Sequence, residues 1–212
     1  MIENCIGKIS LPLGLGLNFL INKLEYVVPM AVEEPSIIAA VSGTAKLIKE
    51  KGGGFSTWSS EPLMIGQIQI LEVDPAVASK AIMNKKDLII GTIQVTLAEA
   101  NSFIPRMVNR GGGVISINCK IVDFSQKEDK LALAKETLMR SSMLVVELVI
   151  NVCDSMGANV VNTVCEKIAP TFHSISGGRI GLRIMSNLCI HRRAGARFHL
   201  PCSALDSEKV SG

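Results

Sequence analysis

The order of strand-like and helix-like segments between residues 63 and 188 constrains the fold more than any other feature of the sequence. The stretch LMIGQIQILEV, from Leu63, alternates as a strand does, and Asp74–Pro75 then begins a long helical pattern. Two strand patterns follow, VISINCKIVDF and SMLVVELVINV, and then a helix, ANVVNTVCEKIAPTFHSI, and a strand, RIGLRIMSNL. This order is that of a split βαβ unit, so we expect an α+β, ferredoxin-like arrangement.

The helical patterns of this segment have recognisable ends. The first runs to about Val108, and we expect it to break at Gly91 and Pro105. The second is expected to begin near Asp154, directly after a buried strand, and to end at Gly177–Gly178. Between the two central strands, the charged loop SQKEDK and the ambiguous segment LALAKETLMR have no clear assignment.

The preceding residues, 6–62, predict strands and a first helix. The helix should have Pro35 at its first position, where the missing N–H would have no partner in any case, and the glycines at 52–54 should end it. Before it we expect two short strands, with turns or breaks at Pro12, Gly14, Gly16 and the pair Asn22–Lys23.

The composition is apolar for a soluble chain, with 48% hydrophobic and 4% aromatic residues. The longest apolar run, MLVVELVINV at 143–152, carries Glu147 and is shorter than the roughly 20 residues of a membrane span. We therefore predict a buried strand there, no membrane span, and a homo-oligomer that buries the excess apolar surface. No secretory signal is visible and the six cysteines have no CxxC spacing, so a cytoplasmic protein with reduced thiols and no metal site is expected.

Nucleic-acid binding has little support in the sequence. The net charge is only +3, and the most basic stretch, HRRAGARFH at 191–199, has no aromatic residues spaced for base stacking. A ferredoxin-like RNA-binding protein is therefore disfavoured.

The segment INVCDSMGAN at 150–159 is a candidate binding site. A helix start offers free N–H groups and a partial positive charge, which suit a phosphate group, and Gly157 would allow a ligand close to the backbone. The alternative is purely structural, with Asp154 or Ser155 capping the helix. The dinucleotide fingerprint is absent, because LGLGL has no third glycine at the required place.

Two carboxylates, Glu33 and Glu34, precede the first helix in the block VEEPS. Placed near the N-cap, Glu34 would be stabilised as an anion by the helix dipole, whereas burial in an apolar cleft would favour the neutral acid. Such a group could donate a proton near neutral pH. The alternative is that both acids only complement the dipole, and Ser36 could bond either a ligand or Glu33.

Four blocks occur in order along the chain: ENCIG at 3–7, VPMAVEEPSIIAA at 28–40, DSMGANVVNT at 154–163 and LRIMSNL at 182–188. Together they resemble the 3-hydroxy-3-methylglutaryl-coenzyme A reductase family. The run NSFIPRMVNRGGG and the GGF after the first helix are similar to the class II, bacterial and archaeal, branch.

The resemblance implies reduction of hydroxymethylglutaryl-CoA to mevalonate and CoA with two NAD(P)H, or the reverse, in isoprenoid metabolism. It assigns Glu34 as the catalytic acid, and Ser36 and Asn187 as substrate contacts. The cofactor loop would comprise Asp154, Met156, Gly157, Ala158 and Asn159. A homodimer contact, through which a partner subunit completes the site, would comprise Glu3, Asn4, Ile6 and Gly7.

The resemblance is incomplete. Family members carry a downstream NKG lysine, expected to stabilise an oxyanion, a GND aspartate, and a C-terminal histidine expected to protonate the thiolate; no NKG or GND occurs here. CIHRR at 189–193 stands where ADRR is expected, and Ser155 replaces an alanine. We expect these 212 residues alone to be inactive. The alternative is a truncated or decayed paralogue that only binds cofactor or dimerises.

These expectations divide the chain into three parts. Residues 1–62 would form the N-terminal part of a mixed α/β substrate-binding and dimerisation domain. Residues 63–188 would form an inserted, ferredoxin-like NAD(P)-binding domain, and 189–212 would return into the first domain.

Overall fold

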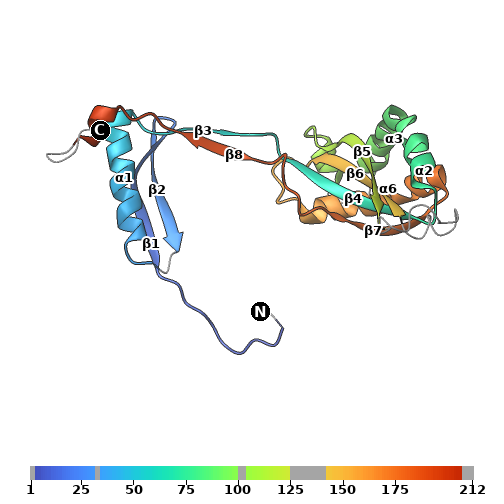
Figure 1. The fold of residues 1–212 in the computed structure, drawn as a ribbon, viewed down its shortest axis with the longest axis horizontal. Helices are drawn as coiled ribbons and strands as arrows, with labels where there is room; N and C mark the ends of the chain where they lie inside the picture. Colours follow the sequence, from blue (N-terminus) through green and yellow to red (C-terminus); the bar gives the residue numbers. More distant parts are fainter. Residues whose placement is uncertain (1–2, 32–33, 100–103, 125–141, 207–212) are drawn as a thin grey trace. The chain divides into compact units, whose positions relative to one another are not determined.

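The computed structural model describes residues 3–31, 34–99, 104–124 and 142–206 (Figure 1). The expected acid Glu33 and the segments SQKEDK and LALAKETLMR lie outside these residues. The chain divides into two compact units. Unit 1 comprises residues 1–59 and 194–212, and unit 2 comprises residues 60–193.

Unit 2 is built on a four-stranded sheet with the order β5-β6-β4-β7. Its strands are β4 (Leu63–Leu71), β5 (Gly113–Asp123), β6 (Ser142–Asn151) and β7 (Arg179–Met185). Every neighbouring pair is antiparallel. The helical connection from β4 to β5 passes over β6, and the connection from β6 to β7 passes over β4. Unit 2 is therefore α+β, as the sequence predicts.

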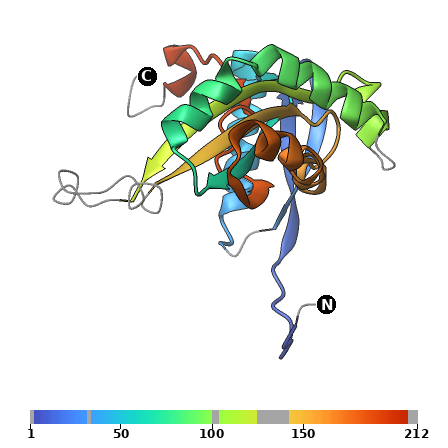
Figure 2. The same ribbon diagram turned by 90° about the vertical axis from the view of Figure 1, so that its right-hand side faces the viewer.

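Three helices connect β4 to β5, namely α2 (Pro75–Met83), α3 (Lys86–Ala98) and α4 (Ile104–Val108). Asp74 starts α2 as predicted, and its carboxylate accepts hydrogen bonds from the N–H groups of Ala76 and Val77. The expected break at Gly91 is wrong: α3 runs through it, and the chain breaks between α2 and α3 instead. In Figure 2 the two green helices, α2 and α3, lie along β5, which both contact.

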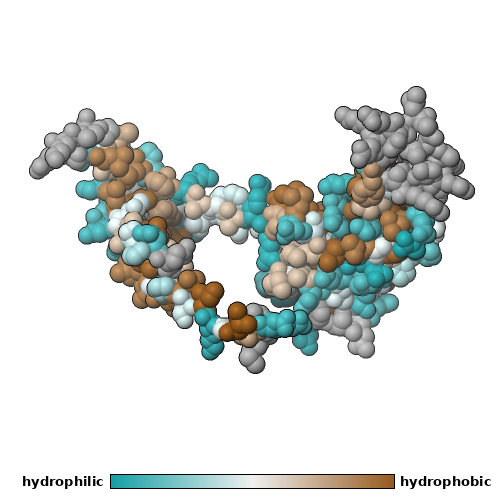
Figure 3. Space-filling model, turned by 60° about the horizontal axis from the view of Figure 1, so that its bottom comes forward, coloured by the Kyte–Doolittle hydropathy of each residue, from teal (hydrophilic) through white to brown (hydrophobic). Residues whose placement is uncertain are grey.

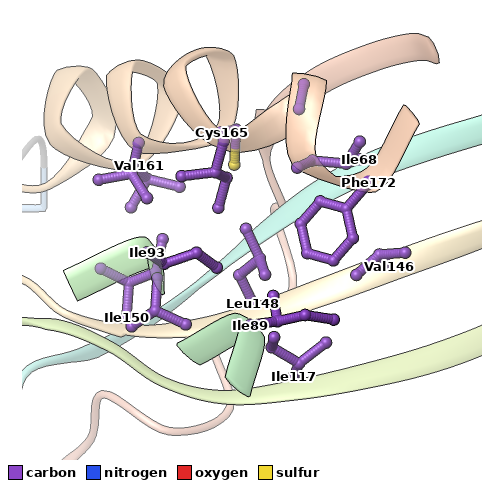
Figure 4. Close-up of a cluster of buried hydrophobic side chains, with 14 of the residues drawn as sticks. Ile68, Ile89, Ile93, Ile117, Val146, Leu148, Ile150, Val161, Cys165 and Phe172 are labelled. Carbon is purple, nitrogen blue, oxygen red and sulfur yellow. The ribbon is translucent and has the colours of Figure 1, made fainter. Parts of the chain in front are cut away.

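The core of unit 2 lies between its helices and one face of the sheet. Apolar side chains of α3 and α6 (Ala158–Ser176) meet those of β4, β5 and β6 (Figure 4). Ile68, Leu148 and Phe172 are fully buried there. Glu147 of β6 is also buried, and its carboxylate pairs with Lys120 Nζ at 2.9 Å and accepts from Gln67 at 3.3 Å. The run MLVVELVINV is thus a buried strand, as predicted.

Unit 1 contains two small sheets and one helix. Strands β1 (Leu13–Ile21) and β2 (Leu24–Ala31) form an antiparallel hairpin, joined at Asn22–Lys23 as predicted. Strands β3 (Ser56–Ser59) and β8 (Ala194–Arg197) pair antiparallel, and a short 3-10 helix, η2, spans Cys202–Leu205.

The glycines of β1 do not break the strand, contrary to expectation. β1 runs through Gly14 and Gly16, and a Cβ at Gly14 would overlap Ile38 of the helix α1 (Ile37–Gly52). Glycine at this position therefore permits close packing of α1 on β1.

The helix α1 begins later than the sequence predicts. Ser36 is the N-cap, so Pro35 precedes the helix instead of occupying its first position. Its end agrees with prediction: Gly53, at φ 77°, is the left-handed C-cap.

Unit 1 buries few apolar side chains. Among its described residues, only Ala45 and Ile48 belong to the buried hydrophobic set. Apolar side chains, brown in Figure 3, lie on its visible surface. Those exposed on the β1–β2 hairpin are Leu13, Leu15, Leu17, Leu24, Tyr26 and Val27.

Candidate functional site

The turn between β6 and α6 contains the DSMGAN block. Ser155 N–H donates to Val152 O at 3.1 Å, and the backbone then passes through Gly157 at φ 115° before α6 begins at Ala158. The helix therefore starts four residues later than Asp154, where the sequence predicted its start. Gly157 is the N-cap, and no side chain caps the helix. The structural alternative for Asp154 and Ser155, that one of them caps α6, is wrong.

Asp154 projects outward from this turn. Its side chain is 89% exposed and pairs with the Arg110 guanidinium at 2.8 Å. Because both partners are exposed, the pair contributes little to stability. It leaves one acidic and one basic group at the rim of the turn.

The turn presents several backbone donors. Among the described residues, no acceptor pairs with the N–H groups of Met156, Gly157, Ala158 or Asn159. The first N–H groups of a helix have no intrahelical acceptor, and together with the helix dipole they attract anions. The donor set fits a phosphate group.

Gly157 is required here by packing as well as by its backbone angle. A Cβ at this position would overlap Met64 Sδ of β4. The structure adds a packing reason for this glycine, the contact with Met64, to the predicted approach of a ligand, which stays a prediction. Replacement of Gly157 would thus disturb the packing of unit 2.

Arg192 also contacts this turn, which the sequence analysis did not anticipate. Its Nη1 donates to Met156 O at 2.9 Å and its Nη2 to Ser155 O at 3.2 Å. In the sequence this region is the most basic stretch, HRRAGARFH, and its CIHRR segment departs from the family pattern. The available signal was the pair of consecutive arginines, Arg192 and Arg193, shortly after the SNL block. Nothing in the spacing connected these arginines to residues 155–156.

In unit 1, Ser36 and Glu34 are linked. Ser36 Oγ donates to Glu34 Oε1 at 2.9 Å, so its hydroxyl bonds Glu34 and does not cap α1. Glu34 O accepts a long bond of 3.4 Å from Ile37 N–H. The Glu34 side chain is exposed, so the described residues do not form the apolar cleft that was expected around it.

The other predicted residues are also exposed. Asn187 follows Ser186, whose N–H donates to Ile65 O of β4 at 2.7 Å. The Ser186 hydroxyl also accepts from Leu188 N–H, so the backbone on both sides of Asn187 is bonded. Glu3, Asn4, Ile6 and Gly7 lie outside any helix or strand and are exposed. The structure brings together Asp154 to Asn159 in one turn, and Glu34 with Ser36.

Two further features of the described residues concern membranes and metal ions. None of the helices in the part of the chain that the structure describes is long and apolar enough to cross a membrane. Within that same part, no three or more His, Cys, Asp and Glu side chains are grouped so as to hold a metal ion.

Comparison with known proteins decides the family. The family model described as "Hydroxymethylglutaryl-coenzyme A reductase" matches residues 1–211. The chain belongs to this family.

Individual relatives agree with this assignment. The chain is 42% identical to a 3-hydroxy-3-methylglutaryl-coenzyme A reductase of Archaeoglobus fulgidus, over 99% of this chain and 43% of that protein. It is 30% identical to a probable reductase of Borreliella burgdorferi, over 94% of this chain and 40% of that protein. The chain thus spans less than half the length of these two relatives.

The fold is also similar to a solved structure. The class II reductase of Streptococcus pneumoniae, bound to NADPH in open conformations, matches with a TM-score of 0.77 and 30% identity. The match covers 98% of this chain and 45% of that one. The α+β fold seen here is therefore that of the corresponding part of a class II reductase.

Proposed function

We propose that this chain supplies the nicotinamide-cofactor site and part of the substrate site of a class II hydroxymethylglutaryl-CoA reductase. The whole reaction would convert hydroxymethylglutaryl-CoA to mevalonate and CoA with NAD(P)H. The observation that carries the proposal is the turn at Asp154–Asn159, where unpaired backbone N–H groups at the start of α6 coincide with the family's cofactor block.

The residues of the turn fit the pyrophosphate of a dinucleotide. Met156, Gly157, Ala158 and Asn159 would bind it through backbone N–H groups, and Asn159 offers its side-chain amide in addition. Bound NAD(P)H would supply the hydride. NADPH is the favoured form, because the similar Streptococcus pneumoniae enzyme was solved with it.

In unit 2, we propose the ferredoxin-like arrangement as the framework for this site. The strand order β5-β6-β4-β7 with antiparallel neighbours supports it, since each helical connection joins strands separated by one other strand. The turn lies at the end of the central strand β6, which fixes the start of α6 against the sheet.

Glu34 is proposed as the proton donor, and Ser36 and Asn187 as contacts of the hydroxymethylglutaryl group. The Ser36 hydrogen bond fixes one carboxylate oxygen of Glu34 and leaves the other to face substrate. The family resemblance supports these roles.

A homodimer is proposed, with Glu3, Asn4, Ile6 and Gly7 at the contact, in the cytoplasm. Ile6 is fully exposed in the single chain, at 105% of its reference area, and Ile9 is 95% exposed. Such apolar exposure supports a partner for this segment.

A second candidate is a module that binds cofactor or dimerises without turnover. It requires only the turn at Asp154–Asn159 for the cofactor and the exposed segment around Ile6 for a partner. Under both readings we expect the 212 residues alone to bind NADPH and give negligible reduction.

Calorimetric titration of the chain with NADPH tests the proposed cofactor site, and NADH serves as the comparison. Saturable binding of NADPH is expected, and its absence would overturn the cofactor site. Glu34→Gln should leave this binding unchanged, because Glu34 belongs to the other unit.

Turnover, measured as loss of NADPH absorbance with hydroxymethylglutaryl-CoA, tests the role proposed for Glu34. Any activity should be abolished by Glu34→Gln and retained by the control Glu50→Gln, which changes an exposed acid at the far end of α1. Activity that survives Glu34→Gln would contradict the role given to Glu34.

A further inference from the structure

Arg192 holds two consecutive carbonyl groups of the turn. Its two terminal nitrogens donate separately, Nη1 to Met156 O at 2.9 Å and Nη2 to Ser155 O at 3.2 Å. The planar guanidinium of arginine presents its donors as a rigid fork, which a lysine cannot reproduce. Arg192 therefore fixes two adjacent peptide groups at once.

The orientation of these carbonyls determines where the neighbouring N–H groups point. In a planar trans peptide, the C=O of one residue and the N–H of the next point in opposite directions. With the Ser155 and Met156 carbonyls turned toward Arg192, the N–H groups of Met156 and Gly157 point away from it. These are two of the unpaired donors of the proposed cofactor site.

Arg192 is itself held in place by its neighbours in unit 2. Ser60 Oγ donates to His191 O at 2.7 Å and accepts from Arg193 N–H at 2.8 Å, so both adjoining residues are bonded to one side chain. The Nη1 atom also lies 3.5 Å from Met64 Sδ, the atom that packs against Gly157. The guanidinium therefore contacts the turn from a fixed backbone and a half-buried position.

We propose that Arg192 is a positioning residue of the cofactor site. It holds the Ser155 and Met156 carbonyls on one side of the turn, so that the Met156 and Gly157 N–H groups face the phosphate of the nucleotide. The ligand in this inference rests on the proposed function, whereas the effect of Arg192 on the turn does not.

The first test measures the turn in the 212-residue chain without ligand. In Arg192→Ala, hydrogen exchange of the Ser155 amide, which is bonded to Val152 O, should become about tenfold faster, as expected for loss of charge-assisted bonds. The Phe172 amide, in the C-terminal part of α6, should exchange at an unchanged rate. Arg193→Ala is the matched control, because it removes the same charge from the adjacent, exposed residue.

The second test measures NADPH binding by calorimetry. Arg192→Ala should raise the Kd about tenfold, Arg192→Lys should recover part of the loss through a single bond, and Arg193→Ala should change the Kd less than about twofold. Equal weakening in Arg192→Ala and Arg193→Ala would show an effect of charge alone and would overturn the proposal.

The two tests separate this inference from the proposed function. If the unmodified chain binds no NADPH but Arg192→Ala still accelerates exchange at Ser155, the cofactor site fails and the ordering of the turn by Arg192 stands. Exchange at Ser155 that is identical in the unmodified chain and in Arg192→Ala would overturn the inference whatever the NADPH result. Weaker or absent NADPH binding together with faster amide exchange at Phe172 would also overturn the inference, because this result would indicate unfolding of α6.

Discussion

Cys165 occupies space that a neighbouring glycine leaves open. It is fully buried on α6, and a Cβ at Gly66 of β4 would lie 2.5 Å from its Sγ and 3.0 Å from Val161 Cγ1. Burial, together with the charge of Glu166, raises the pKa of the Cys165 thiol to about 12. The thiol is therefore a packing group of the core. The prediction of mostly packed cysteines is wrong for Cys5, Cys189 and Cys202, which are exposed.

The raised pKa makes part of the stability depend on pH. Between the ordinary thiol pKa of 9.0 and the raised pKa of about 12, the folded chain keeps the Cys165 proton and the unfolded chain loses it. Stability from this group is thus fully present below pH 9.0 and falls by about 1.4 kcal/mol per pH unit above it. In urea unfolding, the free energy of unfolding of the unmodified chain should exceed that of Cys165→Ala by roughly 1–2 kcal/mol. This difference should shrink as the pH increases. A constant advantage would contradict this, and the exposed Cys202→Ala serves as the control.

Gly157 provides a second prediction at the residue scale. Gly157→Ala should destabilise unit 2 by about 1–3 kcal/mol, because alanine is strained at positive φ and its Cβ would overlap Met64. Met64→Ala in the same chain should recover the part due to overlap. Gly177→Ala, also at positive φ but with open space around it, should cost only about 1 kcal/mol in urea unfolding. Equal costs at Gly157 and Gly177 would show that Met64 plays no part.

At the scale of elements, helix starts differ in how they are capped. The Asp74 carboxylate accepts from two N–H groups of α2, whereas α1, α3 and α6 have no side-chain cap. The start of α2 was predictable because Asp-Pro is a local signal. The start of α6 was not, because the chain first makes the turn that Gly157 and Arg192 hold.

The cap of α2 predicts a measurable loss. Asp74→Ala should lower the free energy of unfolding by about 0.5–2 kcal/mol, since two N–H groups lose their acceptor. Asp74→Asn should retain most of the stabilisation that the cap provides. Asp87→Ala, which changes an acid in the first turn of α3 without a cap bond, should cost only a few tenths, about 0.3 kcal/mol. Chemical denaturation of the three variants measures the difference, and an equal loss at both positions would exclude capping as the cause.

At the scale of the whole molecule, the two units contain very different numbers of buried apolar side chains. The buried cluster around Ile68, Leu148 and Phe172 belongs to unit 2, whereas the described part of unit 1 buries only Ala45 and Ile48. An apolar hollow of about 340 Å³ between α1 and the side chains of Phe19, Phe55 and Phe198 adds to the exposed surface of unit 1. We therefore expect unit 1 to be less stable on its own than unit 2.

This difference predicts that unit 2 folds independently. A fragment of residues 60–193 should give one cooperative urea transition and a dispersed amide spectrum. A fragment of residues 1–59 should show neither, because it cannot bury enough apolar surface to offset chain entropy. A folded 1–59 fragment, or an unfolded 60–193 fragment, would contradict this account.

The sequence by itself determined the order of the four sheet strands and of the two helical connections in unit 2, the buried strand with Glu147, the Asp74 start of α2 and the glycine ends of α1 and α6. These depend on local periodicity and turn chemistry. Only the tertiary structure decided the pairing of Arg192 with residues 155–156, the packing of Gly157 on Met64 and of Gly14 on Ile38, and the exposure of Glu34. These depend on which distant segments meet, and contacts between residues far apart in the sequence leave no periodic trace in the chain.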